Sequence, residues 1–244
     1  MAGAAEATTF VLVHGAWHGG WCWKAVADVL RGRGHRVTTP TQTGLGERAH
    51  LLSKSITLPV FVQDIVNHLN FEDLTDVILV GHSFGGAPAI GAADRLRQRI
   101  ARLILLDGAI MEDGETWFGL LPRDIRDARF RLARETSAGM SLPVPPPSEF
   151  GVTDPAQVKY LSAKLTPHPL ATFSTELELN GPPGNGLPVD YIACTQPVHK
   201  PAAACHERAK ALGWPVTEFA AAHDAMITAP LASAELLEKL AAAR

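Results

Sequence analysis

The sequence predicts an α/β fold, with a mostly parallel sheet of about six strands flanked by helices. Short apolar runs rich in β-branched residues recur along the chain and alternate with helix-compatible segments. That alternation is typical of a parallel sheet whose two faces are both covered. The 244 residues suffice for one large domain, and the 46% hydrophobic and 19% charged content is ordinary for a globular protein.

The first strand is predicted over Thr9–Val13, and the loop after it is dense in Gly and Trp. Gly34 is expected to end the helix that follows, because glycine readily adopts the left-handed conformation found after helix C-termini. The other elements before the central strand are expected in the order helix 24–33, strand 35–40, loop 41–55 and helix 58–69.

The centre of the prediction is a Gly-x-Ser-x-Gly sequence at residues 81–85. An apolar strand, Val77–Val80, precedes it directly, and a helix-compatible run, 87–97, follows. Strand, sharp turn and helix are the context of a nucleophile elbow, in which only small flanking residues leave room for the strained turn. The alternative is a glycine-rich turn with a solvated serine. The flanking elements favour Ser83 as a nucleophile.

The second half of the chain supplies three more strands, 103–106, 189–195 and 216–219, and a final helix. Between the first two of them, residues 110–187 carry many prolines and no clear strand. The carboxyl ends of parallel strands share one edge of the sheet, where open α/β sheets place ligand sites. We therefore expect 110–187 to form a cap over a pocket at that edge. The core domain is then 1–109 with 188–244.

A serine hydroxyl needs a base to take its proton. His223 lies between the last strand and the last helix and is the predicted base, with a surface histidine as the alternative. The oxyanion formed on attack is expected to bind the backbone N–H groups of Phe84 and Ala16. Asp224 is expected to be a loop or helix-capping residue, because an adjacent side chain seldom reaches its neighbour's ring.

Several aromatic side chains could line an apolar substrate pocket, although core or cap packing is the alternative for each. The candidate lining residues are Trp17, His18, Trp117 and Phe118. His14 and His82 are expected to be structural, with hydrogen bonds inside their own loops.

Three stretches carry a family resemblance: FVLVHGAWHGGWCW at 10–23, VILVGHSFGG at 77–86 and YIACT at 191–195. They resemble the branch of the α/β-hydrolase superfamily that holds the plant methylesterases and hydroxynitrile lyases. They are also similar to small bacterial esterases, including a carbendazim-cleaving hydrolase. The resemblance implies the α/β-hydrolase fold. It also implies a serine hydrolase that cleaves a small, largely apolar or aromatic carboxylic ester, carbamate or lactone through an acyl-Ser83 intermediate.

One departure from that family concerns the acid that orients the catalytic histidine. In the family an Asp stands two residues after the Thr of YIACT, where this chain has Pro197. Asp107 ends the strand next to the nucleophile strand on the same edge, and we predict that it replaces the missing acid. Two alternatives remain open: Asp107 only begins a turn, or Ser83 and His223 act as a dyad.

A dyad would favour an activated substrate or a different chemistry. The alternatives to ester hydrolysis are therefore a lyase or cyclase that uses Ser83 and His223 as an acid–base pair, and a non-catalytic binder of small ligands.

Other classes of function lack support in the sequence. The formal net charge of −3 gives no reason to expect nucleic acid as a partner. No metal-ligand spacing and no nucleotide-binding glycine pattern occurs, so we expect no metal and no cofactor. No apolar run could span a membrane, no signal peptide is expected, and the three unpaired cysteines suit a cytoplasmic protein. The expected partner is a small-molecule substrate, with a homodimer left open.

Overall fold

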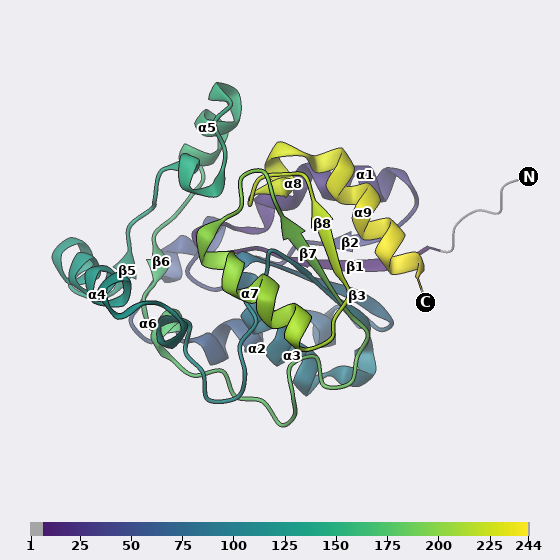
Figure 1. Cartoon of the computed structure of the whole chain (residues 1–244), viewed down its shortest axis with the longest axis horizontal. Helices are drawn as coiled ribbons and strands as arrows, with labels where there is room; N and C mark the ends of the chain where they lie inside the picture. Colours follow the sequence, from purple (N-terminus) through teal and green to yellow (C-terminus); the bar gives the residue numbers. More distant parts are fainter. Residues whose placement is uncertain (1–6, 244) are drawn as a thin grey trace, which may run out of the picture.

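The computed structural model describes residues 7–243, and a six-stranded sheet runs through its centre (Figure 1). The strands are β1 (Thr9–Val13), β2 (Arg36–Thr38), β3 (Val77–His82), β4 (Ile100–Leu106), β7 (Val189–Cys194) and β8 (Val216–Phe219). Their order is β2-β1-β3-β4-β7-β8, and every neighbouring pair is parallel. The predicted α/β fold with a parallel sheet of six strands is confirmed.

Helices cover both faces of this sheet. The α-helices are α1 (Lys24–Gly32), α2 (Leu58–Phe71), α3 (Gly86–Arg95), α4 (Arg123–Ser137), α5 (Pro155–Ser162), α6 (Ala171–Ser174), α7 (Lys200–Ala211), α8 (Ala225–Thr228) and α9 (Pro230–Ala242). Helices α1 and α9 pack together on one face, and α2 and α3 pack together on the other. Among the described residues, no helix combines the length and the apolar character that a membrane span requires.

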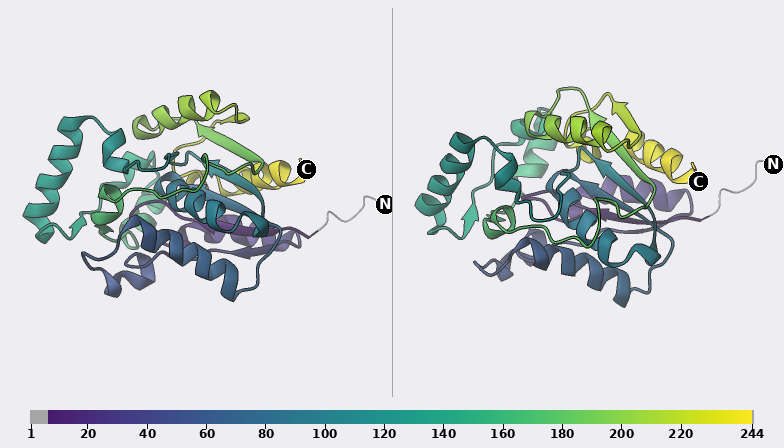
Figure 2. Two further views of the ribbon diagram at one scale, coloured as in Figure 1. Left: turned by 90° about the horizontal axis from the view of Figure 1, so that it is seen from below. Right: turned by 60° about the horizontal axis from the view of Figure 1, so that its bottom comes forward.

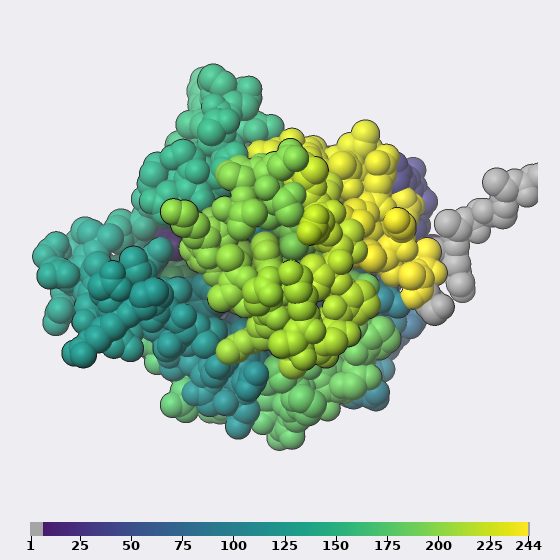
Figure 3. All heavy atoms as spheres, in the orientation of Figure 1, coloured from purple at the N-terminus to yellow at the C-terminus, as the bar shows by residue number. Residues whose placement is uncertain are grey.

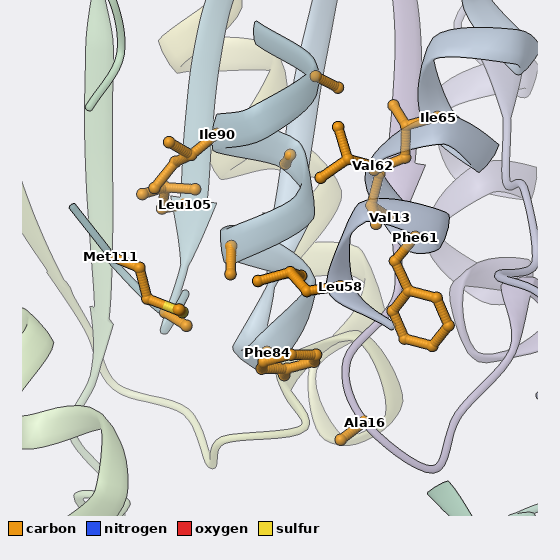
Figure 4. Close-up of a cluster of buried hydrophobic side chains, with 14 of the residues drawn as sticks. Val13, Ala16, Leu58, Phe61, Val62, Ile65, Phe84, Ile90, Leu105 and Met111 are labelled. Carbon is orange, nitrogen blue, oxygen red and sulfur yellow. The ribbon is translucent and has the colours of Figure 1, made fainter. Parts of the chain in front are cut away.

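The core has one layer on each side of the sheet, because successive residues of a strand point to opposite faces. In β1, Phe10 and Leu12 pack against α1 and α9, whereas Val11 and Val13 pack on the side of α2 and α3. All four are fully buried. Figure 4 shows the second layer, with Phe84 at the end of the cluster that lies near the carboxyl ends of the strands.

Several predicted boundaries differ from the structure by one to three residues, and the strand expected over 103–106 begins earlier, at Ile100. Two other differences have a physical cause in the structure. The strand expected over 35–40 is shorter, because β2 is an edge strand that pairs only with β1 and Pro40 cannot donate to a ladder. The loop expected over 41–55 contains a 3₁₀-helix, Gly46–Leu51. Arg48 holds this loop through hydrogen bonds to the carbonyl oxygen of Thr41 (2.8 Å) and to Thr43 Oγ1 (2.7 Å). Hydrogen bonds inside such an irregular loop leave no periodic pattern in the sequence.

Residues 110–187 leave the sheet after β4 and return to it at β7. They contain α4, α5, α6 and two strands that pair antiparallel, β5 (Ser141–Leu142) and β6 (His168–Pro169). Strands of two residues are too short for the alternation that sequence analysis relies on, so none was expected here. Both views of Figure 2 place α4 at the end of the molecule opposite the C-terminal end of α9. In Figure 3 this segment (teal) lies beside α7 (green).

Candidate active site

Ser83 lies on a sharp turn between β3 and α3, as its flanking sequence predicts. Its φ is 51°, an unusual value for a residue with a side chain. Gly81 and Gly85 make this turn possible, because a Cβ on either would approach backbone atoms within 2.9 Å and 2.3 Å respectively. The atom that a Cβ of Gly85 would meet is the carbonyl oxygen of His14, so the loop after β1 packs tightly against the turn.

A chain of hydrogen bonds joins Ser83, His223 and Asp107. His223 Nε2 lies 2.9 Å from Ser83 Oγ, and His223 Nδ1 lies 2.8 Å from Asp107 Oδ2. An ionised carboxylate only accepts, so Nδ1 carries the proton and Nε2 presents its lone pair to the serine hydroxyl. The three side chains come from the ends of β3 and β4 and from the loop after β8, as the topology predicted.

The Asp107 carboxylate is buried and fully engaged. Its Oδ1 accepts hydrogen bonds from His206 Nε2 (2.7 Å) and from the backbone N–H of Cys194 (2.9 Å). Burial on its own would raise the pKa of Asp107, but the hydrogen bonds from His206 and His223 hold it well below its ordinary value. The carboxylate therefore stays ionised and keeps accepting from His223 Nδ1. The contact between Asp107 and His206, 99 positions apart, has no local signal in the sequence.

A cavity of about 60 Å³ opens beside the serine, and we call it the Ser83 cavity. It is lined by Ala16, Trp17, Ser83, Phe84, Trp117, Arg129, Pro145, Glu149, Phe150, Phe173, His199 and Pro201. Ala16 and Phe84 are both on its wall. Among residues 7–243, neither of their backbone N–H groups donates to a backbone carbonyl in a turn or loop. The predicted lining residues Trp17 and Trp117 lie on its wall.

The other two predicted lining residues, His18 and Phe118, do not contribute to this wall. Phe118 is only 2% exposed and packs against Phe130 and Phe173. Phe118 is therefore a packing residue, which was the alternative to a lining role. Four further lining residues were not predicted, because their placement depends on how 110–187 and α7 dock on the sheet: Arg129, Glu149, Phe150 and His199.

A model of the alpha/beta hydrolase family matches residues 10–236. The chain belongs to this family. The hydrolase is 38% identical to a carbendazim hydrolyzing esterase of Nocardioides sp. (strain SG-4G), in an alignment that covers 96% of this chain and 98% of that protein.

More distant relatives include methylesterase 9 of Arabidopsis thaliana, which is 40% identical over 93 residues. That alignment spans 38% of this chain and 36% of the methylesterase. Among solved structures, an extracellular alpha/beta-hydrolase from a Paenibacillus species has a TM-score of 0.84 at 26% identity and covers 95% of this chain and 98% of its own. The hydrolase is thus an enzyme whose relatives are named esterases.

His199 covers one face of the His223 ring in this hydrolase. The two ring centroids are 3.9 Å apart and the planes meet at 22°. Burial and the neighbouring His223 lower the pKa of His199 to about 4, so its ring is neutral near pH 7. A neutral ring excludes water from one side of His223 without repelling a positive charge there. This contact occupies the loop after β7, where the sequence lacks the family's acid.

Asp224 and His18 form a buried pair beside the site, and this corrects the predicted pocket-lining role of His18. Asp224 does stand at the N-terminal cap position of α8, but its side chain pairs with His18 and does not cap the helix. His18 Nδ1 lies 2.8 Å from the carbonyl oxygen of Ala16, and Nε2 lies 3.0 Å from Asp224 Oδ2. Both partners accept, so both ring nitrogens donate and the ring is an imidazolium. Burial opposes this charge, but Asp224 raises the pKa of His18 above its ordinary value. The pair ties the loop of Ala16 to the loop of His223.

His82, His223 and Asp224 bring potential metal ligands within 4.8 Å of one another. However, His82 Nε2 donates to the carbonyl oxygen of His223 (2.9 Å), and both ring nitrogens of His223 are engaged. Of this group, only His82 Nδ1 and Asp224 Oδ1 lack a hydrogen-bond partner among the described residues. Two remaining donors do not make a metal site. His82 instead fixes the backbone of His223.

Proposed function

We propose that the protein is a serine esterase that cleaves small, largely apolar or aromatic carboxylic esters or carbamates through an acyl-Ser83 intermediate. The observation that carries this proposal is the unbroken chain of hydrogen bonds from Ser83 Oγ through His223 to Asp107, on the wall of a cavity. The similarity over nearly the whole chain to an esterase named for carbendazim hydrolysis supports ester-type substrates.

In the first half of the reaction, Ser83 Oγ attacks the carbonyl carbon of the ester while His223 Nε2 takes its proton. Asp107 stabilises the resulting imidazolium and keeps its Nδ1–H directed at the carboxylate. The negative oxygen of the tetrahedral intermediate accepts hydrogen bonds from the N–H groups of Ala16 and Phe84. The alcohol then leaves with the proton from Nε2. In the second half, a water molecule activated by His223 releases the acid.

The same proposal assigns 110–187 the role of a cap. Half of the residues that line the Ser83 cavity belong to this segment, namely Trp117, Arg129, Pro145, Glu149, Phe150 and Phe173. Their aromatic and apolar surfaces restrict water around the reacting carbonyl, which strengthens the electrostatic interactions there. Differences in this segment would then alter which substrates are accepted, while the chemistry stays with the sheet.

Labelling with a fluorophosphonate tests the mechanism. We expect the wild-type protein to gain one phosphonyl group, detected by intact mass spectrometry, and to lose p-nitrophenyl acetate hydrolysis in parallel. Ser83→Ala should show neither labelling nor turnover while keeping its thermal unfolding temperature. Turnover of the ester by Ser83→Ala would contradict the acyl-Ser83 step. Tight binding of aromatic esters without turnover by the wild type would instead identify a ligand-binding protein.

A further inference from the structure

One cation lines the Ser83 cavity without an acceptor of its own. Arg129 lies on the inner side of α4, one residue before Phe130 and one turn before the buried Ala133. Within residues 7–243 its guanidinium makes no hydrogen bond or ion pair. Burial lowers the pKa of Arg129, and the negative charge of Glu149 opposes this. The pKa of Arg129 is lowered overall.

The guanidinium rests above an aromatic ring instead. Its Cζ lies 5.9 Å from the ring centroid of Trp17, a residue of the same cavity wall. A cation–π contact at this distance offsets part of the cost of removing the charge from water, but it leaves the five N–H donors of arginine without acceptors. A partly buried guanidinium without an acceptor in the protein favours a ligand that brings one.

We propose that Arg129 determines specificity by donating a hydrogen bond to a neutral carbonyl oxygen on the acyl part of the substrate. The inference rests on the proposed esterase function and adds a substrate class to it. A neutral acceptor fits better than a carboxylate, because Glu149 lies on the same wall and repels negative charge.

The direction of the proton transfer places the acyl part of the substrate on the side of Arg129. His223 Nε2 protonates the leaving alcohol, so the alcohol faces His223. A second cavity of about 250 Å³ touches that histidine and is lined by Ser148–Gly151, Pro197–Pro201 and His223. The acyl part then extends into the Ser83 cavity, which contains Arg129 and not His223.

Beyond Arg129 the wall continues into an apolar groove of about 440 Å³ between α4 and residues 142–146. Four residues belong to both spaces: Trp17, Arg129, Pro145 and Glu149. Three exposed apolar side chains gather in the groove, namely Ile125 (43% exposed), Leu132 (42%) and Val144 (37%). The favoured substrate is therefore an ester whose acyl chain carries a keto or amide carbonyl at the level of Arg129 and is apolar beyond it.

Three p-nitrophenyl esters of matched length test the inference: the pentanoate, the 4-oxopentanoate and the hemisuccinate. We expect the wild type to have its highest kcat/KM with the 4-oxopentanoate. Arg129→Gln should lower that value about tenfold, the effect expected of one lost charge-assisted hydrogen bond, and change the pentanoate value less than about twofold. Arg126→Gln is the matched control, because Arg126 lies on the same helix but lines neither space.

An equal loss with all three esters would overturn the inference, since Arg129 would then only support Trp17. Unchanged values for Arg129→Gln would overturn it as well, and a preference for the hemisuccinate would show that the site selects negative charge instead. A binding measurement remains decisive even if no ester is cleaved. In Ser83→Ala, titration of tryptophan fluorescence should give methyl 4-oxopentanoate a Kd about tenfold below that of methyl pentanoate. Equal Kd values would contradict the role of Arg129.

Discussion

Replacing Asp107 with Asn would keep the shape of the side chain and reverse one hydrogen bond. Oδ1 accepts from the backbone N–H of Cys194 (2.9 Å), which can only donate, so the amide oxygen of Asn is held at that position. The amide NH₂ then faces His223 Nδ1 and donates to it. The His223 proton would move to Nε2, which could no longer accept the proton of Ser83.

The expected cost follows from losing the base while the geometry stays intact. A wrong histidine tautomer lowers kcat by about 10⁴-fold in serine hydrolysis with a His–Asp pair. At about 1.36 kcal/mol for each factor of ten, the barrier would rise by about 5.4 kcal/mol. His206→Gln is the matched control. It weakens one hydrogen bond to Oδ1 and leaves the contact with His223 in place, so we expect a loss within about tenfold.

Steady-state hydrolysis of p-nitrophenyl acetate at neutral pH measures both variants, with thermal unfolding as the check that each is folded. If folded Asp107→Asn lost less than about tenfold in kcat, the reasoning would be wrong, because the tautomer would not depend on Asp107. Ser83 and His223 would then act as a dyad. A large loss in His206→Gln as well would mean that the whole hydrogen-bonded group, and not the tautomer, sets the rate.

Four further predictions concern stability and use urea unfolding. Asp224→Asn should lower the free energy of unfolding by about 3–5 kcal/mol, because it leaves the buried charge of His18 without a partner. His18→Gln should then cost much less in the Asp224→Asn variant than in the wild type. Gly85→Ala should cost about 3 kcal/mol or more, since its Cβ would lie 2.3 Å from a backbone oxygen. A Cβ on Gly32 would have no other heavy atom within 4 Å, so Gly32→Ala should raise the free energy of unfolding by about 0.5–1 kcal/mol. Burial lowers the pKa of His14 from 6.5 to about 3. Between these two pH values the unfolded chain binds a proton at His14 that the folded protein does not bind. The free energy of unfolding should therefore fall as the pH drops from 6.5 to about 3.

Local sequence signals predicted the frame of the molecule. The run of apolar residues before Gly81 and the small residues around Ser83 allow few conformations, so the strand and the turn could be identified without tertiary information. The same holds for residues 10–13 of β1 and 103–106 of β4, which are buried on both faces of the sheet and are all apolar. The edge strand β2 was overestimated, since an edge strand has only one partner to define its length.

Contacts between distant residues were the part that the sequence could not supply. His18 and Asp224 are 206 positions apart, and no pattern in the chain indicates that they pair in the interior. Arg129 is one of several arginines in α4, and only the way the helix docks distinguishes it from the others. The aromatic candidates show the same limit, because Trp117 and Phe118 are adjacent in the chain and only the first lines the cavity.

The position of the acid illustrates how the sheet tolerates such a change. Strands β3, β4 and β7 are neighbours, so a carboxylate at the end of β4 is close both to Ser83 and to the loop after β7. Asp107 reaches His223 with φ at 48°, a left-handed value that Asp adopts more readily than most residues. With the acid on β4, the loop after β7 can contribute Pro197 and His199 to the cavity walls instead. A neutral ring therefore lines the Ser83 cavity from the loop in which the resemblance implies a carboxylate.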